Sequence, residues 1–130
     1  MERVIENFLR YVVIDTESSE ESASTPSTAK QHNLAKVFAE QLEEMGAEEI
    51  TYDEEHCYVY ASVPASVGCE MAPVIGFIAH MDTSPAVTGA GVKPRVIDNY
   101  DGKDILLNEE KQVVMKTADF PELVSYVGKR

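Results

Sequence analysis

The chain has 130 residues, of which 44% are apolar and 26% are charged, a composition typical of a single globular domain. Eleven Lys and Arg residues stand against 23 Asp and Glu residues, so the formal net charge is −12. This charge argues against binding to nucleic acids or to anionic membranes, because both need clustered basic side chains. It leaves divalent metals and cationic ligands open.

The cysteines and the N-terminal residues favour a cytoplasmic location. Cys57 and Cys69 are too far apart for a CxxC redox motif or a zinc ribbon, and although one disulfide would be possible, nothing indicates an oxidising compartment. Residues 1–6 alternate charged and apolar side chains, unlike a signal peptide. No run approaches the ~18 consecutive apolar residues of a membrane span. We therefore expect a cytoplasmic protein with neither a membrane nor a nucleic-acid partner.

The first third of the chain predicts two helices joined by a polar connection. Apolar residues recur at helical spacing within residues 2–14, which favours an amphipathic helix. Residues 16–28 are rich in Ser, Thr and Glu, and we expect a solvated connection. A second helix is predicted over residues 26–45, with Thr25-Pro26 as its N-terminal cap and Gly46 as its end.

Three strands are predicted next. Residues 48–52 and 57–63 are separated by a short acidic turn, a pattern typical of paired strands. Val74–Ala79 is an unbroken apolar run, which is the signature of a strand buried on both faces in the middle of an α/β sheet. We expect the helices at 2–14 and 26–45 to cover that central strand.

The remaining residues predict fewer regular elements. Residues 80–104 contain several Gly and Pro residues with little periodicity, and a loop of that length is usually functional or disordered. A strand at Gln112–Lys116 and a short helix within Asp119–Val127 are expected near the end of the chain.

His80-Met81-Asp82 is the candidate for chemistry because it follows the predicted central strand, where open α/β sheets place their ligands. In an extended backbone, residues 80 and 82 point to the same side. An imidazole can bind a metal, and a neighbouring carboxylate can orient the ring through its other nitrogen. We expect the other histidines, His32 and His56, to face solvent instead of binding a metal.

Four segments of the chain resemble the M20 family of zinc peptidases. Residues 77–85, Phe-Ile-Ala-His-Met-Asp-Thr-Ser-Pro, resemble the first metal-binding motif of that family. Within the family the resemblance is closest to the tripeptide aminopeptidases. The other matching segments occur in the same order along the chain as in those enzymes: residues 8–12 with Asp15, Thr16 and Ser18; residues 91–94; and residues 99–105. The resemblance spans nearly the whole chain.

The resemblance implies a fold and two site residues. The fold would be α/β, a partial three-layer αβα zinc-peptidase catalytic domain with a central mixed sheet and the N-terminal helices packed on it. Residues 1–130 would form the N-terminal part of this domain, with the lid or dimerisation domain and the remaining catalytic segments outside it. His80 would bind one of two Zn²⁺ ions, and Asp82 would be the catalytic acid that supports this histidine.

The implied activity is removal of the N-terminal residue from tripeptides by metal-assisted hydrolysis. Small peptides would be the substrates, and the complete enzyme could be a homodimer. We expect the 130-residue chain alone to be inactive and to bind zinc weakly or not at all, since one His and one Asp cannot complete a zinc site. Two alternatives stay open: another M20 hydrolase, such as a dipeptidase or an N-acyl amino-acid deacylase, and a non-catalytic interaction or structural domain that retains the HxD motif. Ala86 replaces an acidic residue frequent in the family, which leaves substrate specificity open.

Overall fold

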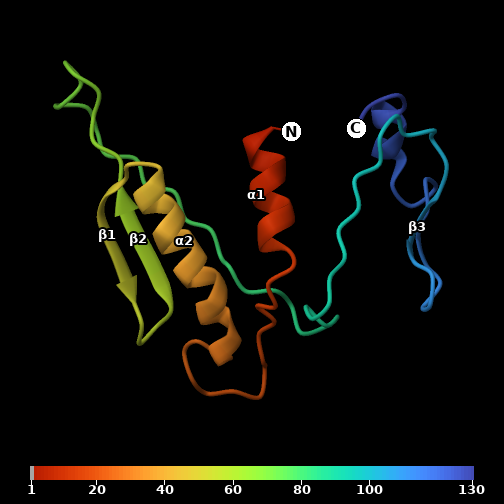
Figure 1. The fold of residues 1–130 in the computed structure, drawn as a ribbon, viewed down its shortest axis with the longest axis horizontal. Coiled ribbons are helices and arrows are strands. Elements are labelled where there is room, and N and C mark those ends of the chain that lie inside the picture. The colour runs from red at the N-terminus through yellow and green to blue at the C-terminus, as the bar shows by residue number, and fades with distance from the viewer. Residues whose placement is uncertain (1) are drawn as a thin grey trace. The chain divides into compact units, whose positions relative to one another are not determined.

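The computed structural model describes residues 2–130, which divide into a first unit that ends at Pro94 and a second unit from Arg95 to Arg130. The elements of the first unit are α1 (Arg3–Tyr11), a 3₁₀ turn (Ala29–Gln31), α2 (His32–Glu44), β1 (Glu48–Asp53) and β2 (Tyr58–Ser62) (Figure 1). Those of the second are β3 (Ile105–Asn108), β4 (Val113–Met115) and a 3₁₀ helix (Pro121–Tyr126). The chain is therefore mixed α/β with small antiparallel sheets, which confirms the predicted class. Within the described residues, every helix is too short or too polar to cross a membrane.

The two predicted N-terminal helices are present, and they contact each other through polar and aromatic side chains. The rings of Tyr11 on α1 and Phe38 on α2 meet edge to face with centroids 4.8 Å apart. The Tyr11 hydroxyl donates to Gln41 Oε1, and Gln41 Nε2 donates to Asn7 Oδ1 at 2.8 Å. Gln41 is buried, so these partners satisfy a polar group that would otherwise destabilise the contact.

The predicted cap at Thr25-Pro26 is wrong, because α2 begins only at His32. The hydroxyls of the intervening residues serve other backbone groups: Ser27 Oγ accepts from the Ser19 N–H at 3.0 Å, and Thr28 Oγ1 donates to the Glu17 carbonyl at 2.7 Å. Thr28 is extended as a result, and helical backbone starts only after it. The other end is as predicted, since Gly46 has a φ of +78° and ends the helix in the left-handed conformation.

The predicted pair of strands forms an antiparallel hairpin, with Thr51 opposite Tyr60. Helix α2 lies against both strands and supplies the buried Leu34 and Ala35 (Figure 1). Cys57, in the hairpin turn, is buried as well. Both cysteines are free thiols. The small core of the first unit is therefore the layer between α2 and the β1–β2 hairpin.

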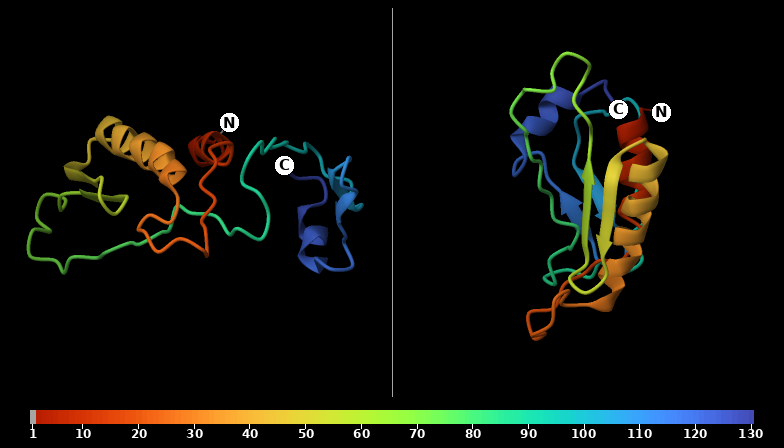
Figure 2. Two further views of the ribbon diagram at one scale, coloured as in Figure 1. Left: turned by 90° about the horizontal axis from the view of Figure 1, so that it is seen from below. Right: turned by 90° about the vertical axis from the view of Figure 1, so that its left-hand side faces the viewer.

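The expectation of a buried central strand at Val74–Ala79 is wrong for the described residues. This segment is extended but pairs with neither two-stranded sheet, and Val74 and Ile78 are 99% and 102% exposed. Figure 2 (left) shows it running by itself after β2, clear of α2. A strand needs a neighbouring backbone to satisfy its N–H and C=O groups, and residues 2–130 offer it none. The layered arrangement around a central sheet therefore stays a prediction.

The second unit is a small hairpin with a turn of 3₁₀ helix. Strand β4 and the helix Pro121–Tyr126 lie where the sequence predicts a strand and a short helix, whereas β3 was not expected. Tyr100 is the buried residue of this unit, and its hydroxyl donates to the Lys103 carbonyl at 2.5 Å. Its backbone bonds with Gly128 and Lys129 tie the start of the unit to its end.

Candidate functional site

The side chains of His80 and Asp82 lie on the same side of the backbone, as predicted. His80 Nδ1 and Asp82 Oδ1 are 3.0 Å apart, although the two side chains are 84% and 41% exposed. At this distance a neutral His80 ring that carries its proton on Nδ1 donates a hydrogen bond to the carboxylate, and its Nε2 then has a free lone pair. A metal ligand held by a carboxylate through its second nitrogen has this geometry.

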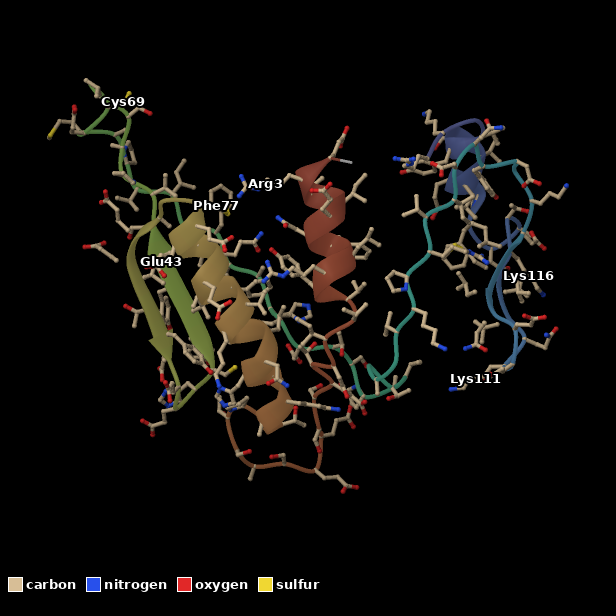
Figure 3. All side chains as sticks on the ribbon, in the orientation of Figure 1. Arg3, Glu43, Cys69, Phe77, Lys111 and Lys116 are labelled. Atoms are coloured by element: carbon tan, nitrogen blue, oxygen red, sulfur yellow. The ribbon has the colours of Figure 1, made fainter. Side chains whose placement is uncertain are left out.

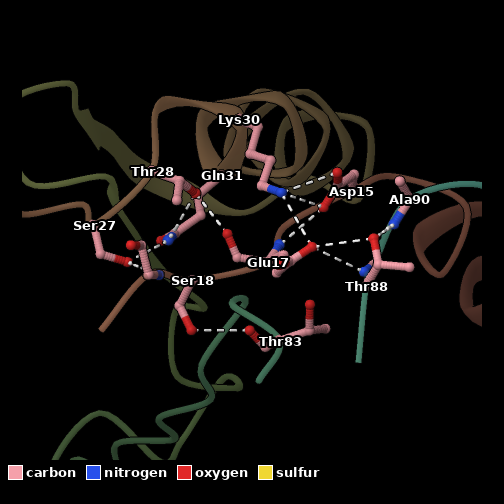
Figure 4. Close-up of polar contacts among 12 residues, drawn as sticks. Asp15, Glu17, Ser18, Ser27, Thr28, Lys30, Gln31, Thr83, Thr88 and Ala90 are labelled. Atoms are coloured by element: carbon pink, nitrogen blue, oxygen red, sulfur yellow. Dashed lines mark hydrogen bonds and ion pairs between the residues drawn. The ribbon is translucent and has the colours of Figure 1, made fainter. Parts of the chain in front are cut away.

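Thr83 fastens the residues that follow this pair to the N-terminal part of the chain. The Thr83 N–H donates to the Thr16 carbonyl at 3.1 Å, and the Thr83 carbonyl accepts from the Ser18 N–H at 2.9 Å. The same carbonyl accepts from Ser18 Oγ at 3.0 Å (Figure 4). Together these bonds form a short parallel bridge at Glu17. Thr16 is only 2% exposed, so the prediction that residues 16–28 are a solvated connection is wrong at this end.

A charged cluster of Asp15, Glu17 and Lys30 lies beside this bridge (Figure 4). Lys30 Nζ is 3.0 Å from the Asp15 carboxylate and 3.4 Å from Glu17 Oε2. The pKa of Asp15 is lowered, first by the hydrogen bond from the Glu17 N–H and then by Lys30. The pKa of Lys30 is raised, mainly by its hydrogen bond to Asp15. The cluster is therefore fully ionised at neutral pH.

Glu17 extends this cluster to the loop after the His80–Asp82 pair. Its Oε2 accepts hydrogen bonds from Thr88 Oγ1 and from the Gly89 N–H, each at 3.2 Å. The bond from Gly89 is the main reason that the pKa of Glu17 is lowered. A Cβ atom on Gly89 would lie 2.9 Å from Asp15 Oδ1 and 3.2 Å from Thr83 Oγ1. Only glycine allows this close approach without a shift of its neighbours.

Sequence reasoning did not identify this cluster as part of the site. In the sequence, Asp15, Thr16 and Ser18 stand out only through the family resemblance, and no pattern distinguishes Lys30 from other lysines. A hollow of about 470 Å³ lies beside the cluster, lined by Glu17–Glu21, Thr28, Lys30, Pro85 and Ala86. Neither His80 nor Asp82 lines it, so the structure does not join this hollow to the candidate ligand pair.

Comparison with known proteins identifies relatives of the whole chain. No protein-family model matches it. It is 54% identical over 129 residues to Peptidase T of Desulfitobacterium hafniense and 50% identical over 129 residues to Peptidase T of Clostridium novyi. These matches cover 99% of this chain. The chain is a homologue of peptidase T. It spans about a third of the length of these relatives, 31% in both cases.

The residues that the structure describes do not form a complete metal site. Among residues 2–130, no three His, Cys, Asp or Glu side chains converge where they could hold a metal ion, whereas catalytic zinc sites need three protein ligands. His56 faces solvent as expected and contacts Asp53 at 2.9 Å. His32 is half-buried instead and lies 2.5 Å from the Tyr52 hydroxyl. The donor chemistry of His80 and Asp82 fits one zinc ligand and its orienting carboxylate.

Proposed function

We propose that this chain provides part of the active site of a zinc-dependent aminopeptidase that removes the N-terminal residue from tripeptides. His80 binds one of two zinc ions through Nε2, and Asp82 orients the ring. The observation that carries this proposal is the 3.0 Å contact between His80 Nδ1 and Asp82 Oδ1, which holds one nitrogen and frees the other. The peptidase T homologues support a peptide substrate.

The residues of this chain position groups for the reaction. A bound zinc ion would lower the pKa of a water molecule and polarise the scissile carbonyl. Asp82 favours the Nδ1–H tautomer of the neutral His80 ring, which presents the Nε2 lone pair to a metal. The bonds of Thr83 to Thr16 and Ser18 hold the backbone directly after Asp82, which limits the positions that the pair can adopt.

The other parts of this function go beyond residues 1–130. We propose that the remaining metal ligands and the general base belong to segments of the kind that make the relatives about three times as long. The complete protein would be a cytoplasmic M20 enzyme, with homodimer formation as a further expectation. The isolated chain would be inactive and would bind zinc weakly or not at all, because it contributes one ligand and one orienting carboxylate.

A chimera tests the proposal. This chain replaces the matching segment of the Desulfitobacterium hafniense peptidase T, to which it is 54% identical, and hydrolysis of tripeptides and zinc content are measured. We expect an active chimera that loses one zinc and most activity with His80→Ala, and that loses activity with partial zinc retention when Asp82→Ala removes the orienting carboxylate. His56→Ala is the matched control and should leave both readings unchanged.

The same chimera separates the alternatives. A folded chimera that cleaves dipeptides or N-acyl amino acids in preference to tripeptides would favour another M20 hydrolase. A folded chimera that binds zinc but keeps full activity with His80→Ala would contradict the assigned role of this histidine. A folded, zinc-loaded chimera without any hydrolytic activity would favour a non-catalytic role for this chain.

A further inference from the structure

Glu17 contacts both ends of residues 83–89, the loop that directly follows the candidate ligand pair. At the near end, its backbone forms a parallel bridge with Thr83. At the far end, its carboxylate accepts hydrogen bonds from Thr88 Oγ1 and from the Gly89 N–H, each at 3.2 Å (Figure 4). One residue therefore holds both the start and the end of this loop.

Glu17 is itself held in place, as an anchor must be. Its N–H donates to Asp15 Oδ1 at 3.0 Å, and its carbonyl accepts from Thr28 Oγ1 at 2.7 Å. Lys30 Nζ lies 3.4 Å from its carboxylate and offsets part of its charge. Thr28 and Lys30 belong to the cap and the 3₁₀ turn that directly precede α2. Through Glu17, the loop is therefore tied to the start of this helix.

Building on the function proposed above, in which His80 binds a metal and Asp82 orients its ring, we propose that Glu17 is a positioning residue for this pair. A loop held only at Thr83 can pivot about that bridge, and its motion reaches Asp82 through a single peptide bond. The hydrogen bonds from the far end of the loop to Glu17 remove this freedom. A displacement of about 1 Å in a reacting group can cost about 100-fold in rate, so a fixed loop favours the reaction.

The contacts of Glu17 predict how its substitution changes the kinetics. Among the described residues, its carboxylate bonds to Lys30, Thr88 and Gly89, so it acts on the pair only through the loop. A group that fixes the geometry of the reacting groups contributes to kcat, whereas a group that binds the substrate uniformly contributes to KM. The two donors from the loop are a neutral N–H and a neutral O–H, so the amide oxygen of a glutamine can accept from them as well. We therefore expect an effect on kcat that Glu17→Gln rescues.

The peptidase T chimera described above tests this with three variants. We expect Glu17→Ala to lower kcat for tripeptides about tenfold or more, with KM and zinc content unchanged, and Glu17→Gln to retain most of kcat. The matched control is Glu43→Ala, which removes the same charge. Glu43, labelled in Figure 3, is exposed near the end of α2 that lies away from the turn carrying Lys30. Glu43→Ala should leave kcat and KM unchanged.

Metal-free NMR of the 130-residue chain gives a second measurement that does not depend on activity. We expect Glu17→Ala to speed hydrogen exchange at the Thr83 and Gly89 amides, while unchanged protection of the β1–β2 hairpin shows that the chain is folded. In alkaline solution, the ¹⁵N shifts of the His80 ring should move part of the way toward those of Asp82→Ala. A role of Glu17 in stability alone would leave these ring shifts unchanged.

The outcomes separate this proposal from the proposed function. If His80→Ala abolishes the activity of the chimera but Glu17→Ala keeps full kcat, Glu17 does not position the pair, although the proposed function stands. If His80→Ala has no effect, both are wrong. Equal effects of Glu17→Ala and Glu43→Ala would also overturn the positioning role. Should Glu17→Ala unfold the hairpin, Thr88→Val removes one of the two loop contacts at an exposed position, and an unchanged kcat in that variant would overturn it.

Discussion

His80 Nδ1 lies 3.0 Å from Asp82 Oδ1 in a chain whose described residues bring no further metal ligand to this pair. The alternation of an extended backbone places residues 80 and 82 on one side, which allows this contact. The anchoring bonds of Thr83, the next residue, restrict the backbone directly beside the pair. A histidine that is oriented in advance loses less rotational freedom when it binds a metal.

The tautomer of His80 is the first prediction. In alkaline solution, where imidazole is neutral, we expect ¹⁵N NMR of the chain to show His80 mainly as the Nδ1–H form, because Asp82 accepts that hydrogen bond. Asp82→Ala should shift His80 toward the mixture of tautomers of a free histidine. His56, which contacts Asp53 instead, serves as the internal control. An unchanged His80 spectrum in Asp82→Ala would refute the orienting role of Asp82.

The close approach at Gly89 leads to a second prediction. Gly89→Ala places a Cβ 2.9 Å from Asp15 Oδ1, which Lys30 and the Glu17 N–H hold in place. We expect a loss of about 1 kcal/mol in stability of the first unit, measured by urea unfolding, and faster hydrogen exchange at the Thr83 amide. Gly76→Ala is the control, since a Cβ there meets nothing within 4 Å. Similar effects of both substitutions would contradict the close approach.

Acid should release the loop from Glu17. The hydrogen bond from the Gly89 N–H and the nearby Lys30 lower the pKa of Glu17 below its ordinary value of 4.5. A lowered pKa stabilises the folded state above 4.5, and this contribution is lost as the pH falls through the lowered pKa. We expect the NMR shift of the Gly89 amide to titrate with a midpoint below 4.5. Glu17→Gln should abolish this titration, whereas Glu70→Gln should not; a Gly89 midpoint at or above the ordinary value would contradict the contact.

The turn of the β1–β2 hairpin should respond to pH in the opposite direction. The hydrogen bond from His56 to the Asp53 carboxylate raises the pKa of His56 above its ordinary value of 6.5. The resulting stabilisation is complete below 6.5 and is lost as the pH rises through the raised pKa. NMR titration of the His56 ring should show this shift, and Asp53→Asn should remove it. Glu54→Gln makes the same charge change in the same turn and should have a smaller effect.

The core between α2 and the hairpin is expected to dominate the stability of the first unit. Leu34 is 5% exposed, and Leu34→Ala should reduce the free energy of unfolding by about 2–4 kcal/mol, because it removes buried methyl groups and leaves a cavity. Val67→Ala, at a position that is 100% exposed, should change it by less than about 0.5 kcal/mol. If urea unfolding gives the same loss of unfolding free energy for Leu34→Ala and Val67→Ala, the layer between α2 and the hairpin is not the core.

Local patterns in the sequence predicted the local elements well. The helical spacing in residues 2–14 and the alternation around the β1–β2 turn depend on neighbours a few residues apart, so they are readable without the fold. The segment 74–79 shows the limit of such reasoning. Its composition indicates what it would bury in a sheet, but the partner strands that would bury it are a property of the rest of the structure.

In the candidate site, too, short-range features could be predicted from the sequence and long-range contacts could not. The same-side placement of His80 and Asp82 follows from the period of an extended chain, and it was predicted. The contacts of Glu17 with Thr88 and Gly89 join residues 71 and 72 positions apart, and no periodicity links such positions. Glu17 is one of three Glu residues in a Ser- and Thr-rich stretch, and nothing in the sequence distinguishes it from the two others before the fold brings the loop to it.

The bridge at Thr83 also determines when the site can form during folding. The bond between Ser18 and Thr83 closes a loop of 65 residues, and that loop contains α2 and the β1–β2 hairpin. The helix and the hairpin depend on short-range contacts and form early, whereas a contact of such long range forms late because the chain must first be drawn together. The segment that carries His80 and Asp82 is therefore among the last parts of the first unit to reach its place. By the same reasoning it is among the first to open, so that an intact anchor at Thr83 reports that α2 and the β1–β2 hairpin have folded.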